Sequence, residues 1–188
     1  MNGKLCFVLS MRRSGSSLLL RLIGKHPQVA KTFFEPNELF EVVERNHIPR
    51  YKDNAYFNEV MDTYKKDYGG WSVVKLVTNA GIEAMRWKRL EEKFYLPHFI
   101  FIQRNPADTY KSWINAETSS RGTCAQNLYI PWWYFINKSF EDFYLKNRSR
   151  CGIIKYEDLC KNADEEMKKV WECLKIEPIT GLQQFIKK

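Results

Sequence analysis

The sequence predicts an α/β fold in which a mostly parallel central sheet is flanked by helices on both faces, giving three layers. Short apolar runs typical of buried strands alternate along the chain with longer segments whose apolar residues recur at helical spacing. The first apolar run enters a turn of small residues that opens directly onto a helical pattern. Because no repeat, low-complexity tract or linker interrupts the 188 residues, we expect a single domain over residues 1–188.

The first half of the chain is predicted to hold three strands, because three short runs are rich in β-branched and aromatic side chains. These strands are residues 5–9, 28–33 and 71–77. Helical periodicity is found between them, over residues 16–23, 37–46 and 54–66. Gly24 and Pro27 end the first helix, and Gly69 and Gly70 break the chain before the third strand.

The second half continues the alternation with two further strands, at residues 99–103 and 152–155. The expected helices are residues 82–92, 107–115, 125–145 and 164–174. Pro106 can start the helix predicted at 107–115, because its fixed φ suits the first helical position. The aromatic cluster 132–135 in the long helix could stack on a ligand, but such a cluster is more often part of a core.

The segment that joins the first strand to the first helix is built like a phosphate cradle. Backbone N–H groups at a helix N-terminus point at an anion, and the helix dipole favours its charge. The register of the nucleotide-binding pattern G-x-x-x-x-G-K-[ST] holds here, but Ser10 replaces its first Gly and Ser16 its Lys. The loop therefore predicts a P-loop-type fold with a different phosphorylated donor. An ordinary strand-to-helix turn is the alternative.

A cation stands where a nucleotide kinase would typically carry a magnesium-binding Asp. The strand 99–103 is followed by Arg104, whose planar guanidinium suits a phosphate. Ser112 follows eight residues later, about two helical turns along, so both side chains could lie at the binding edge of the sheet. This arrangement favours a second phosphate group over a magnesium ion.

Five motifs in this order resemble the sulfotransferases that use 3′-phosphoadenosine 5′-phosphosulfate (PAPS). The motifs are Arg-Ser-Gly-Ser-Ser at 13–17, His-Pro at 26–27, Phe-Glu-Pro at 34–36, Arg-Asn-Pro at 104–106 with Ser112, and Lys-Tyr-Glu-Asp-Leu at 155–159. The first and third are most similar to carbohydrate sulfotransferases, with a fainter likeness to tyrosylprotein ones. The Arg-Lys-Gly-like cluster that many members carry near the C-terminus is not matched in residues 181–188.

The resemblance implies how the donor is held. The 5′-phosphosulfate would lie on the loop formed by Ser14, Gly15, Ser16, Ser17 and Leu18. Arg104 and Ser112 would contact the 3′-phosphate. Tyr156 would lie near the adenine, although its segment could instead be a helix start with acidic residues in the first turn. Gly15 should tolerate no side chain, because the loop backbone must approach the donor closely.

The resemblance also implies three catalytic residues. Arg13 occupies the position of the loop cation that stabilises the leaving group, although a solvated loop charge is the alternative. Glu35 matches the carboxylate that serves as base in the carbohydrate and tyrosine branches, although an acidic residue before a helix is also common. Lys75 matches a strand Lys of cytosolic members, and Val77 replaces their catalytic His. Lys75 is also unusual in itself, because a charge inside an apolar strand is rare unless it is paired or functional.

Composition agrees with an anionic small-molecule ligand. The net charge is +8, and the basic residues are scattered with no nucleic-acid motif. The implied donor is PAPS and the partner is a hydroxyl acceptor, with carbohydrate favoured and no metal or nucleic acid. The three His residues lie too far apart in sequence for a metal site, and the five Cys residues form no C-x-x-C pair, which favours free buried thiols at Cys6 and Cys151. We expect a soluble, cytoplasmic protein without a membrane span.

Two other functions remain open from the sequence. A P-loop nucleotide or metabolite kinase would need the loop Lys and the strand-end Asp, which are replaced by Ser16 and Arg104. A catalytically silent protein that keeps only the nucleotide pocket would show the same motifs, and an activity assay would separate it from an enzyme.

Overall fold

Five parallel strands form one sheet in the order β2-β3-β1-β4-β5. The computed structural model describes residues 4–34, 69–78, 90–91, 94–117 and 126–186. The strands are β1 (Lys4–Met11), β2 (Val29–Phe34), β3 (Trp71–Thr78), β4 (His98–Gln103) and β5 (Cys151–Lys155). The helices are α1 (Ser16–Ile23), α5 (Pro106–Glu117), α6 (Gln126–Lys146), α7 (Tyr156–Lys161) and α8 (Ala163–Leu174), with short 3-10 turns η2 (Arg148–Arg150) and η3 (Leu182–Phe185). The predicted α/β fold class is confirmed.

Most predicted elements lie where the periodicity placed them. The first helix has the expected bounds, Ser16–Ile23, while the first strand is longer than expected and runs from Lys4 to Met11. The short helix α7 begins at Tyr156 and has Glu157 and Asp158 in its first turn, which is the helix start that the sequence left open as an alternative. The predicted helices at 37–46 and 54–66 lie outside the described residues, and so does most of the one at 82–92, of which Leu90 and Glu91 are helical.

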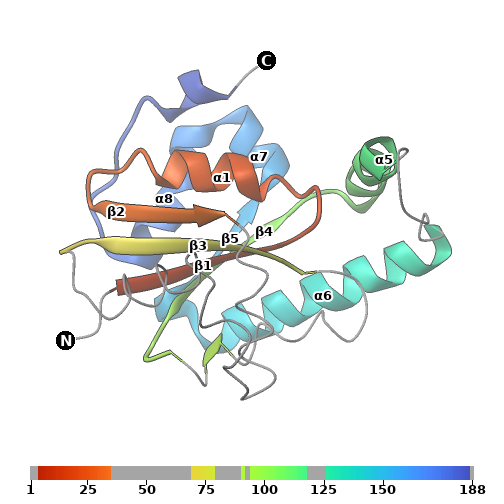
Figure 1. The fold of residues 1–188 in the computed structure, drawn as a ribbon, viewed down its shortest axis with the longest axis horizontal. Helices are drawn as coiled ribbons and strands as arrows, with labels where there is room; N and C mark the ends of the chain where they lie inside the picture. The colour runs from red at the N-terminus through yellow and green to blue at the C-terminus, as the bar shows by residue number, and fades with distance from the viewer. Residues whose placement is uncertain (1–3, 35–68, 79–89, 92–93, 118–125, 187–188) are drawn as a thin grey trace, which may run out of the picture.

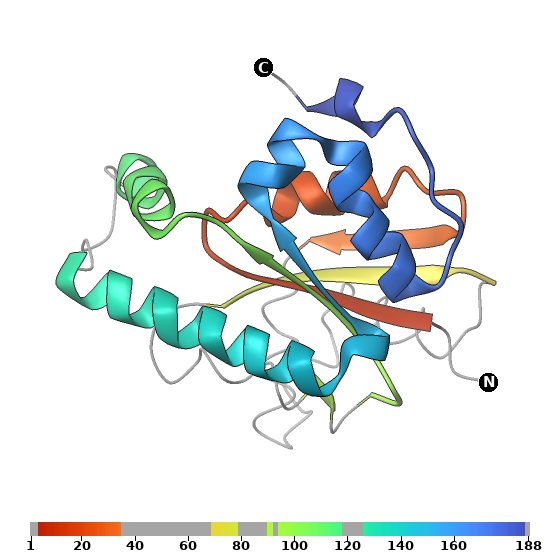
Figure 2. The same ribbon diagram turned by 180° about the vertical axis from the view of Figure 1, so that it is seen from behind.

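Alternating residues of β1 divide the core into two layers. Leu5, Phe7 and Leu9 belong to the apolar cluster on the α6 face of the sheet. Cys6 and Val8 belong to the cluster that α1 and α8 cover on the other face. Figure 1 shows α6 below the sheet and the pair α1 and α8 above it, and Figure 2 shows the same layers from behind. Both faces of the parallel sheet are therefore covered, as the apolar strands require.

The long helix α6 covers its face mainly through aromatic contacts. Phe140 stacks on Phe101 with ring centroids 4.6 Å apart, and Trp133 packs against the same cluster. Tyr134 and Phe135 remain 61% and 57% exposed, so the interpretation of residues 132–135 as core is wrong for these two. None of the described helices combines the length and apolar character that crossing a membrane requires.

Cys6 and Cys151 lie buried as free thiols, as predicted. Burial raises the pKa of the Cys151 thiol to about 12 and that of Cys6 well above its ordinary value. Both thiols are therefore protonated and unreactive at neutral pH.

A buried carboxylate fixes the end of β5. Glu166 is 5% exposed, and its Oε1 accepts a hydrogen bond from the backbone N–H of Lys155 at 2.9 Å. Its other oxygen accepts from Lys169 Nζ at 2.6 Å, so the charge is paired. Lys155 is the last residue of β5, and Tyr156 follows it directly. The position of Tyr156 therefore depends on α8.

The variant Glu166→Ala should lower the free energy of unfolding by about 1–3 kcal/mol, because it removes a buried charge-assisted bond and leaves the Lys155 N–H without its acceptor. Urea denaturation followed by circular dichroism measures this change. Glu165→Ala is the matched control, since Glu165 pairs with Lys168 at 2.6 Å on the exposed side of the same helix. The control should change stability little. Equal losses in the two variants would contradict the role of Glu166.

Candidate functional site

The turn from β1 into α1 has two residues in the left-handed region. Arg13 has φ 66° and Gly15 has φ 92°, and α1 begins at Ser16. The Ser14 N–H donates to Met11 O at 3.3 Å, and the Gly15 carbonyl accepts from the N–H groups of Leu18 and Leu19. The first N–H groups of a helix have no intrahelical acceptor, so this tight turn aims donors at the space beyond the strand ends.

The two residues that depart from the nucleotide-binding pattern bond to each other. The Ser10 hydroxyl donates to Ser16 Oγ at 2.9 Å, and both residues are buried. A cation reaches the loop from the next strand instead, because Lys75 Nζ donates to Ser17 Oγ at 2.7 Å. Lys75 is only 3% exposed. The loop therefore keeps a lysine ammonium at its helix end, although it comes from β3.

Tyr156 packs directly on the loop. A Cβ built on Gly15 would lie 2.5 Å from Tyr156 Cε2 and closer still to Cδ2, so no larger residue fits. The Arg104 guanidinium lies over the same ring, 4.5 Å from its centroid, and Arg104 Nη1 donates to Arg13 O at 3.1 Å. A hydrogen bond with Cys160, and then burial, raise the pKa of Tyr156, which keeps the ring neutral beneath the cation.

The N-terminus of α5 sets the position of Ser112. Asn105 caps this helix, since its Oδ1 accepts from the N–H groups of Ala107 at 2.9 Å and Asp108 at 3.3 Å. Pro106 occupies the first helical position, as predicted. Two turns later, Ser112 Oγ accepts a hydrogen bond from Arg13 Nε at 3.2 Å.

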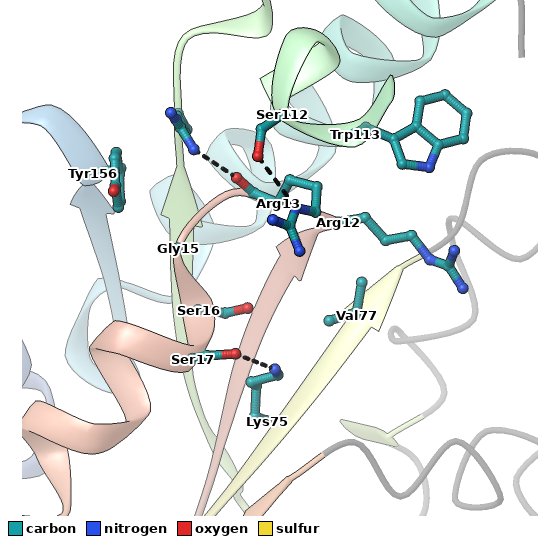
Figure 3. A pocket seen from close by; sticks show the side chains of 11 residues that line it. Arg12, Arg13, Gly15, Ser16, Ser17, Lys75, Val77, Ser112, Trp113 and Tyr156 are labelled. Atoms are coloured by element: carbon teal, nitrogen blue, oxygen red, sulfur yellow. Dashed lines mark hydrogen bonds between the residues drawn. The ribbon is translucent and has the colours of Figure 1, made fainter. Parts of the chain in front are cut away.

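These side chains surround a cavity of about 500 Å³ at the carboxyl ends of the strands. Figure 3 shows Tyr156 at one end and Arg12 with Trp113 at the other, with Arg13 between them. The described residues that line it are Arg12, Arg13, Gly15, Ser16, Ser17, Lys75, Val77, Arg104, Ser112, Trp113 and Tyr156. This described lining holds four cations and no carboxylate, so it favours an anionic ligand.

A second cavity of about 330 Å³ adjoins the first and shares Arg13, Arg104 and Ser112 with it. Its further lining comes from α5, namely Asp108, Lys111 and Asn115. Arg104 Nε is buried and has no hydrogen-bond partner among the described residues. The planar guanidinium of Arg104, which borders both cavities, suits the oxygens of a phosphate.

The structure brings together most residues that the sequence analysis singled out. Ser14 and Leu18 belong to the loop but do not line the cavity, and Glu35 lies outside the described residues. Val77 lines the cavity two residues beyond Lys75, where the resemblance places a His in cytosolic members. Among the described residues, no three His, Cys, Asp or Glu side chains are placed to hold a metal ion.

Sequence reasoning missed five residues that line the cavities. Arg12 and Trp113 line the first cavity, and Asp108, Lys111 and Asn115 line the second. Arg12 and Trp113 each adjoin a predicted site residue in sequence, as does Lys111 beside Ser112. Being next to a predicted site residue was the one indication in the sequence for these three residues. It does not show which neighbours of a site residue face the ligand.

Comparison with protein families identifies the chain's relatives. A family model described as the sulfotransferase domain matches residues 4–187. The chain belongs to this sulfotransferase family. The resemblance to PAPS-dependent sulfotransferases is therefore confirmed at the level of the family, whereas the match does not single out the carbohydrate or tyrosylprotein branch. No curated protein matches the chain.

Solved sulfotransferases share the fold at low identity. A mouse sulfotransferase complexed with PAP aligns at 19% identity with a TM-score of 0.66, over 97% of this chain and 62% of the mouse protein. A sulfotransferase domain from the curacin biosynthetic pathway aligns at 19% identity with a TM-score of 0.67, over 100% of this chain and 79% of that domain. The chain thus spans less than two thirds of the mouse protein.

The same architecture also occurs in a phosphoryl-transferring enzyme. Shikimate kinase from Bacteroides thetaiotaomicron aligns at 10% identity with a TM-score of 0.50, over 92% of this chain and 99% of the kinase. The fold therefore does not distinguish a sulfotransferase from a kinase. The two activities must be distinguished by the side chains of the site.

The structure gives Gly15 a second reason to be glycine. From the sequence, a side chain at Gly15 is expected to block the donor, but the Tyr156 ring already occupies the space that a Cβ would need. Gly15→Ala should therefore displace Tyr156 and lower stability by more than the roughly 1–2 kcal/mol of a left-handed alanine. Gly181→Ala is the control, since Gly181 has φ 82° but its Cβ would meet only the end of the Gln184 side chain, at 3.4 Å. Urea denaturation compares the two, and equal losses would contradict the contact.

Proposed function

We propose that this protein transfers a sulfuryl group from PAPS to an acceptor hydroxyl, with a carbohydrate acceptor favoured. The observation that carries the proposal is the cavity lining, in which four cations and no described carboxylate surround an anion-binding turn. In a nucleotide kinase the loop Lys and a magnesium-binding Asp do this work, and here Ser16 and Arg104 take their places. Family membership supports the same donor.

Two adjoining cavities fit a donor with two separated anionic groups. We assign the 5′-phosphosulfate to the loop at Gly15, Ser16 and Ser17, with Ser14 and Leu18 contributing their backbone. The 3′-phosphate then lies against Arg104 and Ser112, which border both cavities. The place of Arg104 at the border of both cavities supports this assignment, because a guanidinium binds a phosphate through two parallel hydrogen bonds. The adenine lies on the Tyr156 side.

The chemistry is an in-line displacement at sulfur. The acceptor oxygen forms a bond to sulfur while the bond from sulfur to the bridging phosphate oxygen breaks, and negative charge develops on that bridging oxygen. Arg13 and Lys75 offset this charge from two sides of the loop. Glu35 removes the acceptor proton in this proposal, since Val77 offers no base on β3.

The acceptor enters from the end of the cavity opposite Tyr156. Arg12, Val77 and Trp113 form that end (Figure 3). The Trp113 indole lines this end of the cavity together with the Arg12 guanidinium, which is a hydrogen-bond donor. An indole beside a hydrogen-bond donor suits a sugar, whose apolar ring face packs on aromatic side chains. This combination favours carbohydrate over a purely apolar alcohol.

The direct test of function is incubation with PAPS and a panel of sugars, phenols and aliphatic alcohols in the presence of EDTA. Chromatography measures the release of 3′-phosphoadenosine 5′-phosphate (PAP), and mass spectrometry detects the sulfated acceptor. Release of PAP together with a sulfated sugar supports the proposal. Tight PAP binding without turnover on any acceptor would identify a silent binding protein instead.

The variant Arg104→Ala should weaken PAP binding by about 2–4 kcal/mol, because it removes a charge-assisted contact to the 3′-phosphate. Isothermal titration calorimetry measures the affinity. Arg148→Ala is the control, since Arg148 lies in η2 at the opposite end of β5 and stacks on Tyr144. Unchanged affinity in Arg104→Ala would remove Arg104 from the donor site.

The variant Glu35→Gln keeps the shape of the side chain and removes the proton acceptor. Turnover should fall by roughly 10²–10⁴-fold while PAP affinity stays near that of the parent. Lys75→Met and Arg13→Ala should lower turnover and also weaken PAP binding, because both cations face donor oxygens. Glu172→Gln, on an exposed residue of α8, is the control. Normal turnover in Glu35→Gln would require a different base and contradict the mechanism.

A further inference from the structure

The turn that carries Arg104 is held by a carboxylate from a different element. The backbone N–H of Asn105 donates to Glu157 Oε1 at 2.8 Å. Glu157 lies in the first turn of α7, and it belongs to none of the groups that line either cavity. We infer that Glu157 is a positioning residue that sets the selectivity for a 3′-phosphorylated nucleotide. This inference rests on the proposed function.

The hydrogen bond between Asn105 and Glu157 lies just beyond the end of the sheet. The parallel pairing of β4 with β5 runs as far as Gln103 opposite Lys155. Beyond this pair the two chains diverge, since β4 leads into α5 and β5 leads into α7. The backbone of Asn105 then has no strand beside it, and the Glu157 carboxylate provides the acceptor. The bond therefore joins the two turns that follow adjacent strands.

Asn105 controls the direction of α5. Its side chain caps the helix through the N–H groups of Ala107 and Asp108, and its carbonyl accepts from the Thr109 N–H at 2.9 Å and hydroxyl at 2.7 Å. A shift of Asn105 moves the start of α5 and hence Ser112, two turns away. Glu157 thus acts on the 3′-phosphate through the backbone of its neighbours.

Arg104 is tied to the same frame through other contacts. Its guanidinium rests on Tyr156, which adjoins Glu157, and its Nη1 bonds to the Arg13 carbonyl. These contacts hold the guanidinium, whereas Glu157 holds the peptide that follows it. The Arg104 guanidinium and the start of α5 must keep their relative positions if Arg104 and Ser112 are to bind the same phosphate. Small displacements of binding groups in such sites have large effects.

The charge of Glu157 offers a competing explanation, because a carboxylate near several cations also changes the local potential. Asp158 separates the two effects. It is the next residue, is exposed, and carries the same charge in the same first turn of α7. Glu157 differs from it because it accepts the hydrogen bond from the Asn105 N–H. A geometric role therefore predicts different results for the two acidic residues, and a charge effect predicts similar ones.

The test measures PAP and adenosine 5′-phosphate affinities by calorimetry for the parent, Glu157→Ala, Glu157→Gln and Asp158→Ala. Because the two nucleotides differ in the 3′-phosphate, the ratio of their affinities measures how much the 3′-phosphate contributes to binding. Glu157→Ala should reduce this ratio about tenfold, with adenosine 5′-phosphate affinity little changed. Glu157→Gln keeps an acceptor oxygen and should retain most of the ratio, as should Asp158→Ala.

A double variant adds a second readout. If Glu157 acts through α5, the effects of Glu157→Ala and Ser112→Ala on PAP binding should be less than additive. Fully additive losses would overturn this route. An unchanged ratio in Glu157→Ala, an equal loss for both nucleotides, or an equal loss in Asp158→Ala would each overturn the inference. A parent protein that does not prefer PAP over adenosine 5′-phosphate would contradict the proposed function itself, and the inference would fall with it.

Discussion

The turn from β1 into α1 places Arg13 and Gly15 in the left-handed region, and the rest of the site is arranged around that constraint. A non-glycine residue is strained there and persists only where its surroundings hold it. Arg104 binds the Arg13 carbonyl and Ser112 accepts from its side chain. The Tyr156 ring fills the space above Gly15. Contacts from the ends of two other strands and from α5 therefore converge on one turn.

The same convergence concentrates positive charge. Arg12, Arg13, Lys75 and Arg104 line one cavity, and like charges at close range repel each other. Lys75 is nearly buried, and its ammonium donates to Ser17 in the loop. An anionic ligand reduces the repulsion between the cations, which is why we interpret the site as a binding site rather than a structural feature. Its two adjoining cavities give the ligand room for two anionic groups.

The local sequence pattern predicted most of the described helices and strands. The features that it missed depend on contacts between residues far apart in the sequence. The bounds of α1 follow from small residues before a periodic run and Gly24 after it. Gly15 contacts Tyr156, and Asn105 bonds to Glu157, although the residues of each pair lie far apart in the sequence. The local sequence pattern does not predict such contacts. The exposure of Tyr134 and Phe135 was missed because α6 covers the sheet with only one of its sides. Arg13, Lys75 and Arg104 line one cavity, as expected of residues near the carboxyl ends of the strands, while their roles and that of Glu35 stay predictions.

We propose that cations on the protein, rather than a magnesium ion, bind a donor with phosphates on both sides of its ribose. Calorimetric titration of the parent protein with PAP and with ATP, each in EDTA and then in excess magnesium, tests this proposal. We expect PAP to bind at least about tenfold more tightly than ATP in EDTA, and magnesium not to strengthen PAP binding. Tighter binding of ATP that depends on magnesium would contradict it.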